Sequence, residues 1–415
     1  MPVPADLFAP DLILVNGVFH TVDPEQPQVS AVAIRDGRFV ATGSDDEVRA
    51  LAGPNTVIED LGGAAVVPGL IDAHNHMQST GIMLREVQLY DTRTIAEIVE
   101  RIAERVKSAK PGEWILGRGW DESLLAEGRH PNRHDLDAVS PDNPVVIHRV
   151  WNKLVCNSAA LRAVGIDRNT PDPPADVLYS GSFERDETGE PTGLFRDRAK
   201  DLITDNVPPY TEDQRVAAIA EGCRAYNATG LTGVAEPGLY PNEIAAYTRA
   251  KREGKLTVRT DMLIAAWGFG APEGEGDLEK NIAFIGTGGS FGDDLLRLEG
   301  VKFMIDGGMS DRTARMFEPY LDQPDHRGTW VVEPNRLVTL IRRIHDLGWP
   351  MDIHTCGDEA QEVVVSAYAD AQRDNPKPWL RHRVHHAYFP TEKALERMAE
   401  AQIPAVVSSP FLTHL

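Results

Sequence analysis

Two histidines one residue apart, His74 and His76, follow an apolar run that begins near Val66. In an extended strand, side chains two positions apart point to the same side, so both imidazoles can aim at one metal ion. Imidazole nitrogens are ligands that zinc and other first-row metals accept. The pair therefore predicts part of a metal site that needs further ligands.

Three more candidates, Lys302, His354 and His386, lie in or at the ends of later apolar runs. A single histidine there is most simply a hydrogen-bonded structural residue, but a set at matching strand ends is typical of a metal centre. An ammonium group has no acceptor, so Lys302 could bind metal only as a carbamate formed with carbon dioxide. The simpler alternative is a salt-bridged lysine. His385 should face away from His386, because neighbours on a strand point to opposite sides.

These residues need a scaffold that brings strand ends together. Apolar runs alternate with helical patterns, and we predict seven strands: one from 66, then 231–235, 258–264, 298–305, 351–354, 383–386 and 404–407. The alternation predicts an α/β fold, a TIM-like (β/α)₈ barrel rather than a doubly wound sheet, with its active site at the carboxyl ends of the strands. The last strand and helix are absent from this sequence. Because open sheet edges aggregate, we expect the natural chain to continue past Leu415.

The predicted barrel carries two additions. Residues 1–63 should form the N-terminal part of a small β-sandwich-type domain, with hairpin signals at Asn16-Gly17 and Asp36-Gly37. Residues 64–415 should form the barrel, which an inserted subdomain interrupts at about 78–206, over the barrel mouth.

Composition narrows the function classes. The net charge of −21 disfavours nucleic acid and anionic membrane surfaces as partners. The three widely spaced cysteines fit a reducing compartment, and the sequence shows neither a signal peptide nor an apolar run near the roughly 20 residues that span a bilayer. We expect a cytoplasmic protein.

Several motifs resemble the metal-dependent amidohydrolase superfamily, and within it the amidohydrolase-3 (YtcJ-like) group. They are VPGLIDAHNH at 67–76, WILGRGWD at 114–121, EPTG at 190–193, VKFMIDGG at 301–308 and RVHHA at 383–387. The first is shared across the superfamily, whereas the tryptophan-rich and Lys-Phe motifs point to the smaller group.

The resemblance implies one ion on His74 and His76, a second on His354 and His386, and a carboxylated Lys302 between them. Zinc is expected, as one or two ions per chain, with manganese, iron or nickel as alternatives. A metal-bound hydroxide would attack an amide-type carbonyl. The family's catalytic aspartate, at the end of the eighth strand, has no counterpart up to Leu415, so no catalytic residue is assigned. The superfamily also suggests a homodimer.

Four residues are candidates for substrate contact: Asn152, Asp306, Asp311 and Arg312. Asn152 is the nearest match to a histidine that many relatives carry before an Asn-Ser pair. Asp306 could instead orient a metal ligand, and Asp311 and Arg312 could equally lie on a surface loop.

We therefore expect a hydrolase of carbon–nitrogen bonds, other than peptide bonds, in a small linear amide or formamide-like substrate. A deaminase or cyclic-amide hydrolase of the same fold is the alternative enzyme, although Lys302 argues against a deaminase, which generally uses one metal. The remaining alternative is a non-catalytic metal-binding or truncated homologue.

Overall fold

The computed structural model describes residues 9–149, 153–173, 181–266, 282–283, 286, 289–309 and 312–408. The chain forms two compact units, Met1–Ile71 and Asp72–Leu415, and each is described by itself. In the described part of the chain, no helix is long and apolar enough to cross a bilayer.

The first unit contains two small sheets and one short helix, α1 (Asp45–Arg49). One sheet has the order β5-β4-β1-β6, from β5 (Arg38–Gly43), β4 (Ala31–Arg35), β1 (Leu12–Val15) and β6 (Val57–Asp60). The other has the order β3-β2-β7, from β3 (Gln28–Val29), β2 (Val18–His20) and β7 (Ala65–Val66).

Only one of the two predicted hairpins in this unit is present. Asp36 and Gly37 have φ values of 52° and 72° and close the antiparallel β4-β5 hairpin, as their turn propensity predicts. The hairpin at Asn16-Gly17 was wrong, because β1 pairs with β4 and β6 while β2 pairs with β3 and β7. This turn carries the chain from one sheet to the other.

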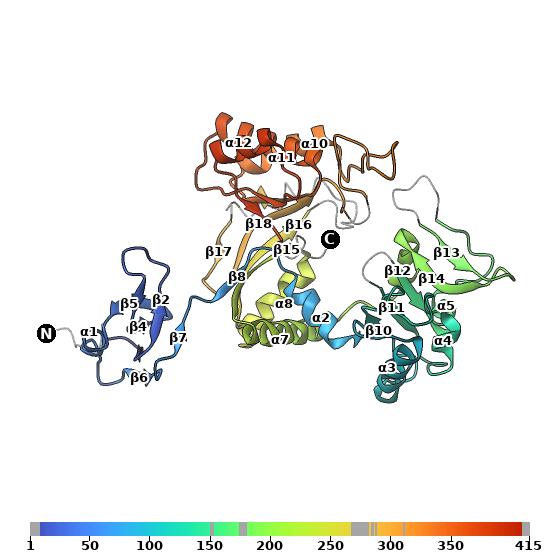
Figure 1. The fold of residues 1–415 in the computed structure, drawn as a ribbon, viewed down its shortest axis with the longest axis horizontal. Coiled ribbons are helices and arrows are strands. Elements are labelled where there is room, and N and C mark those ends of the chain that lie inside the picture. The colour runs from blue at the N-terminus through green and yellow to red at the C-terminus, as the bar shows by residue number, and fades with distance from the viewer. Residues whose placement is uncertain are drawn as a thin grey trace. The chain divides into compact units, whose positions relative to one another are not determined.

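The second unit is built on a curled, half-barrel sheet with the order β21-β20-β19-β18-β16-β15-β8 (Figure 1). All neighbouring pairs from β15 to β21 are parallel. The seven predicted strands are present as β8 (Leu70–Asp72), β15 (Leu231–Leu239), β16 (Arg259–Ala265), β18 (Leu296–Met304), β19 (Met351–Thr355), β20 (Arg383–His386) and β21 (Ala405–Val406). A short strand, β17 (Phe291–Gly292), pairs antiparallel with β18.

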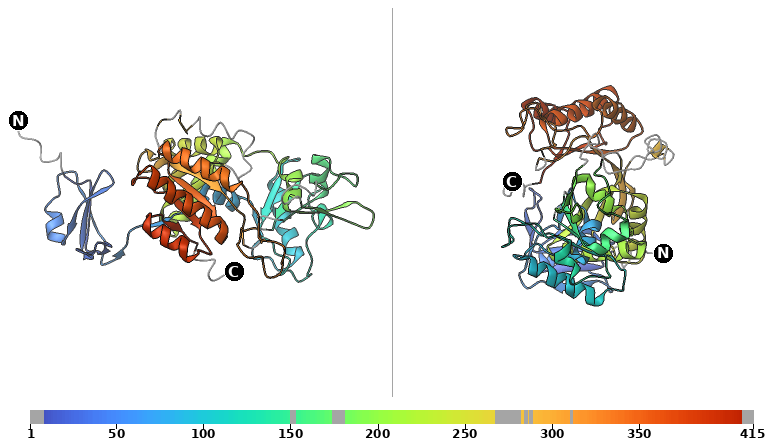
Figure 2. Two further views of the ribbon diagram at one scale, coloured as in Figure 1. Left: turned by 90° about the horizontal axis from the view of Figure 1, so that it is seen from above. Right: turned by 90° about the vertical axis from the view of Figure 1, so that its right-hand side faces the viewer.

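Helices connect these strands and cover the sheet with apolar faces. They are α2 (Met77–Arg85), α7 (Glu212–Ala228), α8 (Pro241–Arg252), α10 (Pro334–Asp346), α11 (Asp358–Asp374) and α12 (Glu392–Glu400). The last three lie side by side in orange and red (Figures 1 and 2), and their buried side chains share one core with β18, β19 and β20. At Gly81, where α2 crosses α7, a Cβ atom would overlap the carbonyl oxygen of Ala218, so only glycine permits this approach.

The chain between α2 and α7 forms a separate six-stranded sheet with the order β13-β14-β12-β11-β10-β9. Its strands are β9 (Val87–Gln88), β10 (Ile115–Arg118), β11 (Val145–His148), β12 (Lys153–Cys156), β13 (Phe183–Arg185) and β14 (Pro191–Arg196). The helices here are α3 (Ile95–Ser108), α4 (Arg133–Asp137), α5 (Ser158–Val164), α6 (Asp201–Thr204) and the 3₁₀ turn η2 (Asp197–Lys200).

Candidate metal centre

The predicted metal ligands lie at the carboxyl-terminal side of neighbouring strands. Lys302 is on β18, His354 on β19 and His386 at the last position of β20, and these three strands are adjacent in the sheet. His74 and His76 lie just past β8, in the connection to α2, where His76 is the N-cap residue. The prediction that both histidines lie in one extended strand was therefore wrong.

The histidine rings form one cluster. The ring centroids of His74 and His76 are 5.3 Å apart, and those of His74 and His386 are 4.8 Å apart. His354 and His386 have centroids 4.5 Å apart. The structure thus brings together four histidines from three segments that are distant in the sequence.

His385 also belongs to this cluster, so the prediction that it faces away was wrong. Its ring centroid lies 4.8 Å from that of His74, and the Nδ1 atoms of the two rings are 2.5 Å apart. The reason is the backbone at the strand end: His386 and Ala387 have φ values of 73° and 47°. This left-handed conformation, uncommon for residues with a side chain, ends the alternation of β20 and lets both rings reach the cluster.

Lys302 is the buried lysine among the predicted ligands. It is 2% exposed, and within the described part of the chain its Nζ has no hydrogen-bond partner. The salt bridge offered as the simpler alternative is thus not formed with any described residue. Burial lowers the pKa of Lys302 to about 7, so a large fraction of the amine is neutral and nucleophilic near neutral pH.

The surrounding imidazoles are neutral because burial disfavours their charged form. Burial, followed by the charge of Lys302, lowers the pKa of His76 to about 4 and that of His354 to about 3. Burial and the neighbouring His354 lower the pKa of His386 to about 2, and the pKa of His74 is lowered further. Neutral imidazoles retain a lone pair, which metal binding requires.

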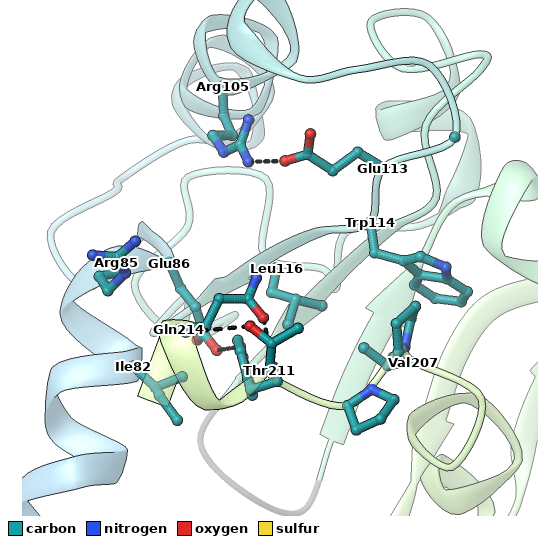
Figure 3. Close-up of a pocket in the computed structure, with 14 residues that line it drawn as sticks. Ile82, Arg85, Glu86, Arg105, Glu113, Trp114, Leu116, Val207, Thr211 and Gln214 are labelled. Atoms are coloured by element: carbon teal, nitrogen blue, oxygen red, sulfur yellow. Dashed lines mark hydrogen bonds and ion pairs between the residues drawn. The ribbon is translucent and has the colours of Figure 1, made fainter. Parts of the chain in front are cut away.

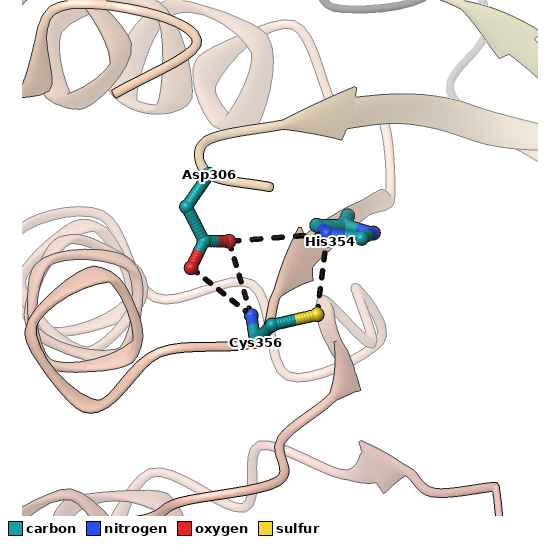
Figure 4. Close-up of side chains that lie close together, drawn as sticks. All are labelled: Asp306, His354 and Cys356. Carbon is teal, nitrogen blue, oxygen red and sulfur yellow. Dashed lines mark hydrogen bonds and ion pairs between the residues drawn. The ribbon is translucent and has the colours of Figure 1, made fainter. Parts of the chain in front are cut away.

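His354 has a defined set of neighbours around Nε2 (Figure 4). The carbonyl oxygen of Gly307 is 3.1 Å from this nitrogen, the Cys356 Sγ is 3.3 Å away and an oxygen of Asp306 is 3.9 Å away. The ligand atoms of His354, Cys356 and Asp306 are close enough to one another to hold an ion themselves. A carbonyl can only accept, however, so a proton on Nε2 satisfies it and leaves a lone pair on Nδ1 of His354.

Asp306, a candidate for substrate contact, braces two loops. Its buried carboxylate accepts hydrogen bonds from the backbone nitrogens of Arg315 at 2.9 Å, Cys356 at 3.0 Å and Gly357 at 2.8 Å. Burial raises its pKa to about 7, against the lowering effect of these bonds. The loops after β18 and β19 are thereby tied together beside His354.

Of the other substrate candidates, Arg312 lies in the connection after β18. Arg312 forms an ion pair of 2.6 Å with Asp322, and both side chains are exposed. Asn152 and Asp311 lie outside the described residues. Contact of any of these residues with substrate stays a prediction.

A second brace holds the segment that carries His76. The backbone nitrogen of Met77 donates to the buried Glu236 at 2.5 Å, and burial raises the pKa of this carboxyl group to about 8. Asp72 accepts from the backbone nitrogen of His74 at 3.0 Å, and Tyr226 donates to Asn75 at 2.5 Å. The sequence hints at these carboxylates only through their positions at strand ends.

A pocket of about 440 Å³ lies beside α2 and the start of α7 (Figure 3). Residues from α2, the β10 strand region and the start of α7 line it, including Glu86, Trp114 and Tyr210. Tyr210 donates to Glu86 at 3.1 Å. None of the predicted metal ligands lines this pocket.

Comparison with known proteins adds independent information. A family model described as "Amidohydrolase family" matches residues 57–413. The putative amidohydrolase YtcJ of Bacillus subtilis is 32% identical over 95% of this chain and 73% of its own length. The N-substituted formamide deformylase of Arthrobacter pascens is 30% identical over 96% of this chain and 72% of its own length.

A solved structure resembles the chain as a whole. The uncharacterized metal-dependent hydrolase from Pyrococcus furiosus matches with a TM-score of 0.75 and 27% identity, covering 95% of this chain and 76% of the other. The half-barrel sheet therefore has the fold of a metal-dependent hydrolase.

Proposed function

Because the chain belongs to the amidohydrolase family and is a hydrolase of carbon–nitrogen bonds, we propose that its histidine cluster holds divalent metal for cleavage of a small amide. His74 and His76 would hold one ion, and His354 and His386 a second. Lys302, carboxylated on Nζ, would lie between them. Zinc is the metal we propose, since imidazole and oxygen ligands suit it.

The observation that carries this proposal is the buried Nζ of Lys302, which has no hydrogen-bond partner among the described residues and lies among neutral histidines. A buried amine without a partner is costly, so it calls for a group that satisfies it. Carbon dioxide added to the neutral amine would give a carbamate, whose oxygens are metal ligands. Four imidazoles and one carbamate would supply enough ligands for two metal ions. A salt bridge of Lys302, by contrast, would need a carboxylate partner, and no described residue provides one.

The chain's own residues would arrange this site. Asp306 and Glu236 hold the backbone beside His354 and His76 through buried hydrogen bonds, which limits the motion of the two ligand segments. Bound metal would supply Lewis acidity and an activated water for attack on the carbonyl carbon. Burial of the histidines keeps them neutral and ready to bind.

We propose a linear amide or formamide-like substrate, which the likeness to the formamide deformylase supports. The alternative within the fold is a deaminase or a cyclic-amide hydrolase. The isolated lysine favours the two-ion arrangement over the single ion that deaminases generally use. Homodimer formation stays a prediction, which light scattering of the purified protein tests.

The test is a substrate panel on protein loaded with zinc, cobalt or manganese, with metal content measured on the same samples. N-substituted formamides, linear amides, cyclic amides and amino-substituted heterocycles are compared by release of amine or ammonia. We expect turnover of the formamides or linear amides, and loss of both metal and turnover in Lys302→Met. Ammonia release from the heterocycles would support the deaminase, and bound metal without any turnover would support the non-catalytic homologue.

A further inference from the structure

The adjacent histidines that end β20 have different surroundings. His386 lies 4.5 Å from His354, centroid to centroid, among the predicted ligands. His385 is fully buried and reaches a carboxylate through its Nε2, which lies 2.7 Å from Asp352 Oδ2. Its Nδ1 faces His74 Nδ1 at 2.5 Å. One ring therefore links a predicted metal ligand to a buried acid.

We propose that Asp352 and His385 form a relay of hydrogen bonds that positions His74 and fixes which of its ring nitrogens faces the metal. The relay rests on the proposed metal centre, but its geometry is a property of the protein alone. His385 is then a positioning residue, and Asp352 anchors it from the neighbouring strand β19.

Asp352 determines which atom donates and which accepts in each hydrogen bond of the relay. Arg383 Nε donates to Asp352 Oδ1 at 2.7 Å. This contact is a buried ion pair, and the guanidinium of Arg383 favours the ionised form of Asp352. The ionised carboxylate can only accept, so His385 Nε2 carries the proton and its Nδ1 presents a lone pair.

That lone pair requires a donor on the facing ring. Two nitrogen lone pairs 2.5 Å apart would repel, whereas a proton on His74 Nδ1 turns the contact into a short hydrogen bond. His74 Nε2 is then the nitrogen left to bind metal. Histidine ligands commonly donate their other N–H to a fixed acceptor in this way.

The contact distance argues against His385 as a metal ligand in this geometry. Two imidazole nitrogens bound to one zinc ion, each at about 2.0–2.1 Å in a tetrahedral arrangement, lie roughly 3.3 Å apart. The observed 2.5 Å is shorter than this separation and closer to that of a hydrogen bond. The structure thus favours a relay over a third ligand.

The first measurement is nitrogen-15 NMR of histidine-labelled, metal-free protein, which reports the tautomer of each ring. We expect His74 to carry its proton on Nδ1 and His385 on Nε2 in the wild type, with the His74 signal shifted in His385→Leu. An unchanged His74 tautomer in that variant overturns the relay, whether or not the protein binds metal.

The second measurement is binding of cobalt(II), followed by its visible spectrum, to three variants. We expect His385→Leu to weaken cobalt affinity by about 10- to 100-fold and His385→Gln, which keeps an acceptor, to restore most of it. His382→Gln is the matched control, because His382 is equally buried on the same chain segment but contacts His345 instead of the cluster; its affinity should not change.

Two results would overturn the relay. Cobalt affinity and spectrum unchanged in His385→Leu would remove any role of His385. Loss of one nitrogen ligand in the X-ray absorption spectrum of both His385 variants would make it a ligand instead. If the wild type binds no cobalt, the proposed metal centre fails, while the tautomer measurement still decides the relay.

Discussion

Two groups of histidines lie beside the same curled sheet, one at the carboxyl ends of its strands and one near the amino end of β20, where His382 meets His345 of α10. At the amino ends, His382 accepts from the backbone nitrogen of Met351 at 3.2 Å, and its Nε2 lies 2.9 Å from His345 Nδ1. His345 Nε2 in turn lies 2.7 Å from the carbonyl oxygen of Asn375. Every ring nitrogen of this pair has a protein partner.

At the carboxyl ends, some nitrogens of the cluster lack a hydrogen-bond partner among the described residues. The ring of His76 forms no hydrogen bond with any described residue, and Lys302 Nζ is buried and equally unpartnered. Buried polar groups in folded proteins are normally satisfied. Burial of a histidine by itself therefore says little about its role, and the feature that sets the cluster apart is a buried amine, Lys302 Nζ, that no described residue satisfies.

The largest effect that separates the two groups is expected for Lys302→Met. This change should lower kcat/KM by about 10³-fold or more, because it removes the group proposed to lie between the ions. The metal-free protein should nevertheless become more stable, by roughly 1–3 kcal/mol, since an unsatisfied buried amine is replaced by an apolar side chain of similar length. Urea unfolding of the metal-free protein, together with the amide assay, measures both changes.

The opposite behaviour is expected at the other histidine group. His382→Phe should lower the free energy of unfolding by about 3 kcal/mol, because Met351 N and His345 Nδ1 lose their partner inside the core. Cobalt affinity of the folded fraction should stay at the wild-type value. Chemical denaturation and cobalt titration of the same sample provide the check.

His386→Gly is the corresponding variant in the histidine cluster, to be compared with His382→Phe. The φ of 73° at His386 suits glycine, so stability should be kept or rise by about 1 kcal/mol, while cobalt affinity falls. Stability lost together with metal affinity would show that the two histidine groups are both structural, and the distinction between them would collapse.

Acidification should lower the free energy of unfolding by a smaller amount. Burial and then His345 lower the pKa of His382 to about 3, below the unfolded value of about 6.5. On acidification the unfolded state therefore binds more protons than the folded state. The contribution of His382 to the free energy of unfolding is fully present above about pH 6.5 and is lost as the pH falls toward 3. At pH 5 the loss should be roughly 2 kcal/mol relative to pH 7.

Urea unfolding at pH 7 and pH 5 tests this sign. His382→Phe removes the titrating group, so its stability should fall less on acidification than that of the wild type. Equal losses in both proteins would show that acid acts elsewhere, for example on the cluster at the strand ends.

The sequence alone was enough to predict the seven strands and the meeting of four histidines, since alternating strands and helices place strand ends together. It could not give the direction of His385, because that depends on the left-handed backbone at His386, which only tertiary contacts impose. Nor could it pair β1 and β2 correctly, since a turn signal such as Asn16-Gly17 specifies a local bend and leaves the choice of sheet to distant strands. The isolation of Lys302 is likewise a property of the folded core.

The smallest effect is expected at the brace beside His76. The pKa of Glu236, raised to about 8 by burial, implies a mostly protonated carboxyl group at pH 7, so Glu236→Gln replaces a neutral group with a neutral isostere. The amide oxygen can still accept from Met77 N, and we expect stability to change by less than about 1 kcal/mol and activity by less than about tenfold. Glu236→Leu is the contrasting variant, since it leaves the Met77 nitrogen without an acceptor at the start of α2 and should reduce metal affinity as well as stability. Equal losses of stability and metal affinity in the glutamine and leucine variants would show that the ionised carboxylate itself is required. Glu236 would then act as a charged group of the metal centre and not only as a hydrogen-bond acceptor for Met77.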